Sequence, residues 1–254
     1  MMITFYQVLA SMSLLGMTAA RSNEEVQQST ASVAANVSTA SGCSSFARFF
    51  DQTDFHVMFP DAVDLYNFNG LVNAASKFTT FASTGNDIND RRELAAFLAQ
   101  TAHESDRFKA AEEYAKDTYS VDQYCDSRLY PCAPGRRYHG RGPIQLSWNY
   151  NYYNAGKYLK IDLVNNPDIV AQDTVVTWMT ALWFWMTPQK DGLIIHDVVT
   201  RDDGFAKSTD IINGGLECGP DAPNKKSEEQ RIMNYIQMCE ALNVQPLGKV
   251  SCNA

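Results

Sequence analysis

The stretch PCAPGRRYHGRGPIQLSWNYNYYNAG, residues 131–156, has an unusual composition. After Gly142 it holds no carboxylate but many neutral hydrogen-bonding side chains, namely Gln145, Ser147, Asn149, Asn151 and Asn154. These alternate with aromatic residues, namely Trp148, Tyr150, Tyr152 and Tyr153. Amides and hydroxyls donate and accept hydrogen bonds, whereas aromatic rings offer flat apolar faces. The mixture suits a neutral ligand with apolar faces and many hydroxyl or amide groups, which describes a sugar.

Helical patterns dominate the rest of the chain. Apolar residues recur at helical spacing in four segments, namely 64–78, 89–105, 165–186 and 227–243. The third is apolar on nearly every side after its proline, which is typical of a central packing helix. Strand-like alternation is scarce, and only Gly142–Leu146 is a candidate short strand. The sequence predicts one mainly helical domain with a small β element.

Length and charge restrict the class of protein. A chain of 254 residues with 45% hydrophobic and 20% charged residues is long enough for one sizeable domain. Its formal net charge is −8, and no lysine- or arginine-rich block is present. Nucleic-acid binders usually present a basic face, so we expect no nucleic-acid partner.

The first 42 residues differ from the rest. Residues 1–20 are apolar and end in Thr18, Ala19 and Ala20, which predicts a cleaved secretory signal; an uncleaved anchor is the alternative. Residues 21–42 are rich in Ser, Thr and Ala and lack aromatic residues, which favours a disordered leader. Asn36 begins a glycosylation acceptor in this leader. We therefore expect a secreted, extracellular monomer with no membrane contact after cleavage.

The cysteines favour disulfides over metal binding. Six follow the predicted signal, and six cysteines allow fifteen pairings. We expect the pairs Cys125–Cys132, Cys218–Cys252 and, by elimination, Cys43–Cys239. No C-x-x-C pair occurs and only four histidines are present, so we predict no zinc site.

Glu104 is a candidate general acid. It lies seven positions after Phe97 on the predicted helix 91–105, so at about 100° per residue it returns to within roughly 20° of the apolar face. Partial desolvation at such a position favours the protonated carboxyl that an acid catalyst needs. The alternative is a surface glutamate near a helix end. A zinc motif H-E-x-x-H is excluded, because Arg107 occupies the second histidine position.

Glu113 is a candidate partner for Glu104. If the helix continued, Glu113 would lie about 13.5 Å further along the axis and on the opposite side. Glycoside hydrolysis with inversion needs two carboxyl groups roughly 6.5–9.5 Å apart, with a water beside the sugar. The chain must therefore bend between Ser105 and Ala111 for this pair to work.

Four segments together resemble a known family. AAFLAQTAHES, PCAPGRRYHGRGPIQLSWNYNYYNAG, NNPDIVAQDTVVTWMTALWFWMT and INGGLECG are similar, in this order, to the signature blocks of the plant-type chitinases, glycoside hydrolase family 19. The resemblance runs from about Cys43 to Cys252. It implies a lysozyme-like α+β catalytic domain at 43–254. It also implies metal- and cofactor-free endochitinase activity, which cleaves β-1,4-linked N-acetylglucosamine polymers with inversion.

The resemblance also implies roles for the carboxylates. By position, Glu104 matches the general acid of the family. Glu113 matches the general base of members with a short loop, whereas Asp117 would match members with a long loop, and Glu112 is an adjacent alternative. We favour Glu113. The chain departs from the family at 106–107, where Asp-Arg replaces the usual pair of glycines.

The sugar-like segment supplies the remaining candidates. Ser147 matches the serine that holds the attacking water. Four residues match sugar-contacting positions, namely Gln145, Tyr150, Asn151 and Asn213. Arg231 matches an arginine near the catalytic carboxylates, where its charge would keep the base ionised. For each neutral residue the alternative is a structural hydrogen bond, and for Trp148, Tyr152 and Tyr153 the choice between sugar stacking and core packing stays open.

Two other functions remain alternatives. The Asp-Arg pair at 106–107 is compatible with a chitin-binding protein that has lost catalysis. A lysozyme-like fold is also compatible with a peptidoglycan hydrolase. Binding of chitin without turnover, or lysis of cell walls without chitin cleavage, would identify these alternatives. If the chain is an endochitinase, as the resemblance implies, we expect its partner to be chitin or chitin oligosaccharides.

Overall fold

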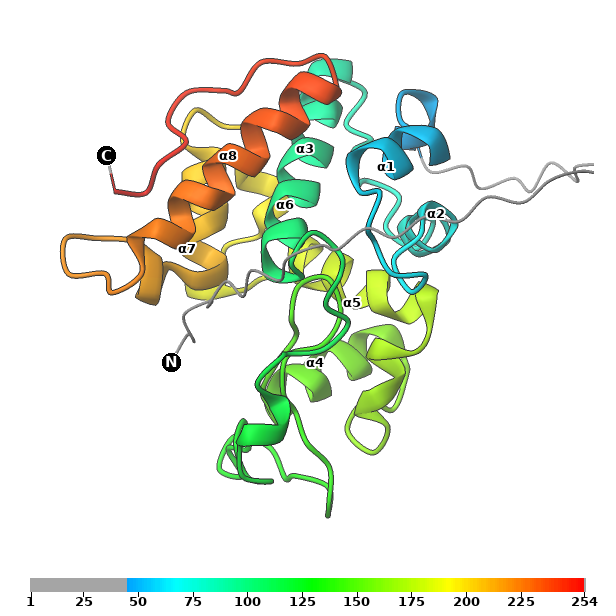
Figure 1. Cartoon of the computed structure of the whole chain (residues 1–254), viewed down its shortest axis with the longest axis vertical. Coiled ribbons are helices and arrows are strands. Elements are labelled where there is room, and N and C mark those ends of the chain that lie inside the picture. Colours follow the sequence, from blue (N-terminus) through cyan, green and yellow to red (C-terminus); the bar gives the residue numbers. More distant parts are fainter. Residues whose placement is uncertain (1–44, 254) are drawn as a thin grey trace, which may run out of the picture. The chain divides into compact units, whose positions relative to one another are not determined.

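The structure, a computed structural model, describes residues 45–253. The predicted signal (1–20), the predicted leader (21–42) with Asn36, and Cys43 lie outside the described residues. The described part is mainly helical, as predicted (Figure 1). Its α-helices are α1 (Gln52–Met58), α2 (Phe68–Ala75), α3 (Asp87–Glu104), α4 (Asn149–Leu159), α5 (Thr174–Met186), α6 (Ile195–Val198), α7 (Gly204–Glu217) and α8 (Lys225–Ala241). Short 3-10 helices cover Ser45–Arg48, Lys116–Thr118, Pro167–Ala171 and Lys190–Gly192.

Polar caps determine where the main helices begin. The Asn86 side chain accepts hydrogen bonds from the backbone N–H groups of Ile88 and Asn89, so α3 begins four residues before the predicted Arg91. Asp173 caps α5 in the same way. These caps satisfy N–H groups that have no partner inside a helix. The end of α3 at Glu104 agrees with the prediction to within one residue.

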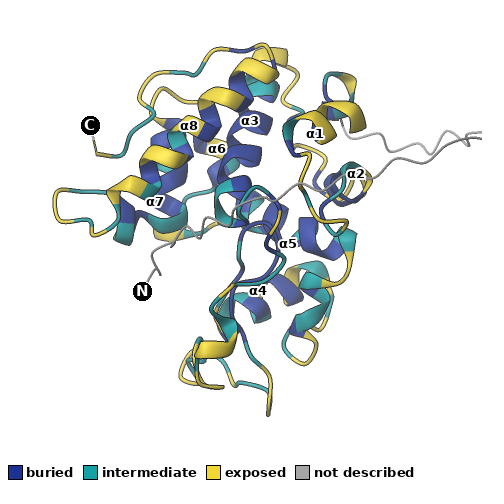
Figure 2. Ribbon diagram, viewed as in Figure 1, coloured by how far each residue is buried: buried dark blue, intermediate teal, exposed yellow. Residues whose placement is uncertain are grey.

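Helix α3 is buried on more sides than its apolar stripe predicts. Every residue from Leu94 to Ala102 is buried, including the small residues between the predicted stripe positions (Figure 2). Figure 1 shows α8 lying along α3, and the two helices pack against each other. Phe97 contacts the rings of Trp178 and Trp185 on α5, which are fully buried as the predicted core helix requires. Among the described residues, no helix is long and apolar enough to cross a membrane.

The predicted strand Gly142–Leu146 is wrong. This segment is a tight turn, with positive φ at Gly142 and Gln145. Arg141 forms isolated antiparallel bridges with Leu146 and with Glu112, and these are the β features of the described residues. Positive φ favours glycine at 142, where an added Cβ would also lie 3.0 Å from Thr177 Oγ1.

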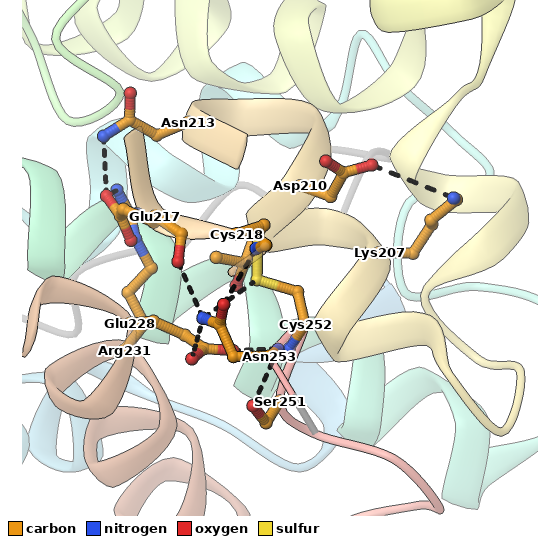
Figure 3. The surroundings of a disulfide bond; sticks show 12 residues. Lys207, Asp210, Asn213, Glu217, Cys218, Glu228, Arg231, Ser251, Cys252 and Asn253 are labelled. Atoms are coloured by element: carbon orange, nitrogen blue, oxygen red, sulfur yellow. Dashed lines mark hydrogen bonds and ion pairs between the residues drawn. A yellow bond between two sulfur atoms is a disulfide. The ribbon is translucent and has the colours of Figure 1, made fainter. Parts of the chain in front are cut away.

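Two of the three predicted disulfides are confirmed. Cys125 bonds to Cys132. Cys218 bonds to Cys252, and Figure 3 shows this second disulfide. The prediction for Cys239 is wrong, because Cys239 is a free and fully buried cysteine. It faces the core side of α8, where burial raises the pKa of its thiol to about 11. Cys239 therefore contributes to packing as a small apolar side chain.

Candidate active site

The chain bends sharply where the candidate site begins. Glu104 is the last residue of α3, and the next residues after the cap have positive φ, namely Asp106 (50°), Arg107 (56°) and Phe108 (65°). The left-handed conformation costs a residue other than glycine roughly 1–2 kcal/mol. The bend expected between Ser105 and Ala111 is therefore present, although the usual glycines are absent.

Burial of Phe108 offsets part of this strain. Its ring is fully buried and packs against four aromatic rings, those of Phe55, Phe59, Tyr66 and Trp178. Ser105 Oγ accepts a hydrogen bond from the Phe108 N–H at 3.1 Å and donates to Thr101 O at 2.7 Å. Burying such a side chain contributes roughly 1.5–3 kcal/mol, which offsets part of the roughly 3–6 kcal/mol that three left-handed residues cost. The direction of the chain after Glu104 is thus fixed by the core.

Glu104 lies beside a buried arginine. Its side chain is 15% exposed, and it accepts a hydrogen bond from Arg231 Nη2. Arg231 is fully buried on α8, and its Nη1 also donates to Gln100 Oε1 at 3.0 Å. Burial opposes the charge of Arg231, but Glu104 and Glu217 outweigh this effect and raise its pKa. Among the described residues, Arg231 contacts the candidate acid and not Glu113, so its role toward the base stays a prediction.

Glu217 is a site residue that the sequence did not single out. It lies at the end of α7, is fully buried, and accepts two hydrogen bonds from Arg231 at 2.8 Å each. Asn213, one turn earlier, donates to Glu217 Oε1 at 2.6 Å (Figure 3). Glu217 belongs to the quoted segment INGGLECG, where a glutamate four residues after Asn213 was the available signal. Two carboxylates therefore share one guanidinium.

His103 is held neutral next to Glu104. Its Nε2 lies 2.8 Å from Ser227 Oγ, at the start of α8. Burial, together with the nearby Arg231, lowers the pKa of His103 to about 2. His103 therefore adds no second positive charge beside the candidate acid.

The three candidates for the base, Glu112, Glu113 and Asp117, lie in different surroundings. Residues 111–113 lie alongside 140–142, with Gly142 N donating to Ala111 O at 2.9 Å and Glu113 N to Gly140 O at 2.8 Å. Consecutive side chains of an extended segment point to opposite faces. Glu112 accordingly pairs with His139 at 2.9 Å and with Arg141 at 3.3 Å. Asp117 is 82% exposed and pairs with Lys116.

Glu113 is surrounded by neutral donors. Its Oε1 accepts hydrogen bonds from the hydroxyls of Tyr119 at 2.9 Å and Tyr124 at 3.0 Å, and its Oε2 from Gly140 N at 3.3 Å. Burial and the neighbouring Glu113 raise the pKa of Tyr124, so its hydroxyl keeps the proton that it donates. Two hydroxyls and one backbone N–H thus point at the carboxylate oxygens of Glu113.

Several residues of 145–153 form structural hydrogen bonds. Gln145 Nε2 donates to Gly142 O at 3.0 Å, and Asn151 Nδ2 donates to Ser147 O at 3.0 Å. The side chain of Gln145 also packs on Gly140, where an added Cβ would lie 2.8 Å from Gln145 Oε1. Tyr152 is fully buried in the core, which excludes sugar stacking for this ring. The segment is thus held in place by the same groups that were expected to contact a sugar.

The sequence-predicted residues form two clusters. The first contains Glu104, Arg231 and Asn213, joined through Glu217. The second contains Glu113, to which Gln145 is linked through Gly140 and Tyr150 through the rings of Tyr124 and Trp148. Ser147 and Asn151 belong to the same segment and are joined by a hydrogen bond. Segment 105–112 joins the two clusters covalently. Among the described residues, no group of three or more His, Cys, Asp or Glu side chains is arranged to hold a metal ion.

Comparison with known proteins gives a consistent result. The family model described as chitinase class I, glycoside hydrolase family 19, matches residues 46–252. The chain is 39% identical over 210 residues to an endochitinase of Pisum sativum and 41% identical over 211 residues to a basic endochitinase of Vitis vinifera. These alignments cover 74% of this chain and 65% and 67% of the two relatives. The chain spans about two thirds of the length of the curated relatives it matches.

Solved structures show the same fold. Chitinase C from Streptomyces griseus is 36% identical, with a TM-score of 0.74 over 80% of this chain and 97% of that chain. A class IV chitinase from Zea mays is 32% identical, with a TM-score of 0.69 over 82% of this chain and 99% of that chain. The predicted mainly α, lysozyme-like fold is thus confirmed.

Proposed function

Because this chain belongs to glycoside hydrolase family 19, the chitinase class I family, we propose that it is a secreted endochitinase. It would cleave β-1,4 linkages of N-acetylglucosamine polymers by a single displacement with inversion. The observation that carries the proposal is the contrast between two carboxylates. Glu104 shares one buried guanidinium with Glu217, whereas the described residues that donate hydrogen bonds to Glu113 are all neutral.

The contrast suits an acid and a base. Glu217 offsets the charge of Arg231, so protonation of Glu104 leaves a guanidinium paired with one carboxylate. Glu104 can therefore carry the proton that the departing glycosidic oxygen needs. Glu113 removes a proton from the attacking water, which the Ser147 hydroxyl holds. The reaction needs no intermediate bonded to the enzyme.

The substrate contacts follow from the second cluster. Tyr150 and Asn151 lie in the first turn of α4, close in sequence to Ser147. Gln145 packs on Gly140, whose N–H donates to the carboxylate of Glu113. Amides and hydroxyls at these positions would bind the hydroxyl and acetamido groups of a neutral sugar. The apolar segment 1–20 supports the proposal that the protein is secreted.

Turnover of glycol-chitin tests the proposal. We expect Glu104→Gln and Glu113→Gln each to lower kcat by about 10²–10⁴-fold, since each removes one proton-transfer group. The matched controls are Glu112→Gln and Asp117→Asn, which remove neighbouring carboxylates outside the proposed chemistry. The anomer first released, followed by NMR, reports inversion. Turnover by Glu104→Gln equal to wild type, or loss of activity only in Asp117→Asn, would contradict the assignment.

A further inference from the structure

Trp148 has a backbone conformation that a tryptophan rarely adopts. Its φ is 73° and its ψ is 134°, at the start of α4. Glycine is the residue that tolerates such angles, and strained residues of this kind cluster at functional sites. The conformation is held by a hydrogen bond from Trp148 N to Tyr138 O at 2.9 Å and by Tyr152 N, which donates to Trp148 O at 3.1 Å. The surrounding structure therefore keeps an unfavourable residue in place.

The indole is exposed in spite of this cost. Trp148 is 36% exposed, whereas the other three tryptophans, Trp178, Trp183 and Trp185, are at most 6% exposed. A buried ring would offset backbone strain through packing, as Phe108 does. Trp148 instead leaves a third of its surface to solvent, so core packing does not account for its position.

The ring continues a row of aromatic side chains that begins at Glu113. Tyr119 and Tyr124 donate hydrogen bonds to Glu113, and their rings are 5.9 Å apart. Tyr124 and Trp148 meet edge to face at 5.4 Å, and Trp148 and Tyr150 are nearly parallel at 5.8 Å. We call these four residues the aromatic row. It leads from the proposed base to Tyr150, in the first turn of α4.

We propose that Trp148 is a sugar-binding platform. The apolar face of an N-acetylglucosamine unit close to the cleaved β-1,4 bond packs on its indole ring. This inference rests on the proposed function. An aromatic face attracts the polarised C–H groups on the flat side of a pyranose. The partially exposed indole offers such a face, and only the ring of Tyr124 separates it from the proposed base, Glu113. Backbone strain at Trp148 is then retained because it presents the ring to the substrate.

Binding of a tetramer of N-acetylglucosamine to the Glu104→Gln variant tests this inference without turnover. We expect the tetramer to shift the tryptophan emission to the blue, because Trp148 is the one exposed tryptophan among four. Trp148→Phe in the same background should abolish the shift. Trp148→Gly and Trp148→Ala should weaken binding about 10-fold, measured by calorimetry as Kd.

Two comparisons separate a binding role from a structural one. Trp148→Gly removes backbone strain together with packing, so its Tm should stay within about 3 °C of the parent while its Kd rises. Tyr158→Ala is the matched control, because Tyr158 is a 55% exposed ring on α4 that packs on Phe78 instead of the aromatic row. Its Kd should equal that of the parent.

Each outcome decides between the two proposals. An unchanged Kd in both Trp148→Gly and Trp148→Ala overturns the platform and leaves the proposed function intact. Equal weakening by Tyr158→Ala also overturns it, since the effect would then not be specific to the aromatic row. Failure of the Glu104→Gln parent to bind the tetramer overturns the proposed function, and the platform with it.

Discussion

Removal of the negative charge at Glu217 tests how Glu104 is kept able to carry a proton. In Glu217→Gln, Arg231 keeps its full charge but loses the carboxylate that it binds through two hydrogen bonds of 2.8 Å. Its charge then acts on Glu104 alone, which favours the ionised form of that carboxyl. We therefore expect the alkaline limb of the pH profile of kcat/KM to move to lower pH.

The structure sets the size of the effect. Two unit charges about 4 Å apart interact by about 4 kcal/mol at an effective dielectric constant of 20, and partial exposure of Glu104 reduces this value. A shift of about one pH unit, equivalent to about 1.4 kcal/mol, is the conservative expectation. On the alkaline side, kcat/KM should fall about 10-fold. Loss of one partner of a buried ion pair also costs about 3–5 kcal/mol of stability, which lowers Tm by about 6–20 °C.

The assay is the pH dependence of kcat/KM on a soluble chitooligosaccharide, at a temperature well below the Tm of the variant. Glu93→Gln is the matched control, because Glu93 is fully buried on the same helix and pairs with His196. It lies eleven residues before Glu104, about 16 Å along α3. We expect it to lower Tm without moving the pH profile. An equal shift in both variants, or none in Glu217→Gln, would refute the reasoning.

Three further outcomes concern stability. Phe108→Ala should destabilise the fold by about 3–5 kcal/mol in urea unfolding, because the core then no longer offsets the strained turn; a loss below 1 kcal/mol would contradict this. Replacing Cys218 and Cys252 with serine should cost about 4 kcal/mol, since the bond closes a segment of 34 residues; an unchanged unfolding midpoint would count against it. The hydrogen bond to Glu93 raises the pKa of His196, so the pair stabilises fully below pH about 6.5 and loses this contribution as pH rises through the raised value. The stability difference between wild type and His196→Gln should therefore shrink from pH 5.5 to 8.5, and a constant difference would exclude the linkage.

Local sequence was sufficient for four of the helices, α2, α3, α5 and α8, and for the chemistry of the candidates. Apolar spacing placed α3 and α5, because a helix that packs on one side repeats its apolar residues every 3.6 positions. The need for a bend after Ser105 also followed from the sequence, since an uninterrupted helix would carry Glu113 to the wrong side. The stretch 131–156, with its amides and rings, indicated a sugar and carried the resemblance to the family.

Tertiary structure alone decided which of these groups meet. Arg231 contacts Glu104 across 127 positions of sequence, through the packing of α8 on α3, and Glu217 joins them from the end of α7. No periodicity reports such a contact, because it depends on how whole helices pack. The choice between Glu112 and Glu113 likewise depends on which face of an extended segment meets the buried Arg141. Sequence patterns describe one element at a time, whereas ion pairs and exposed rings such as Trp148 are set by the positions of several elements together.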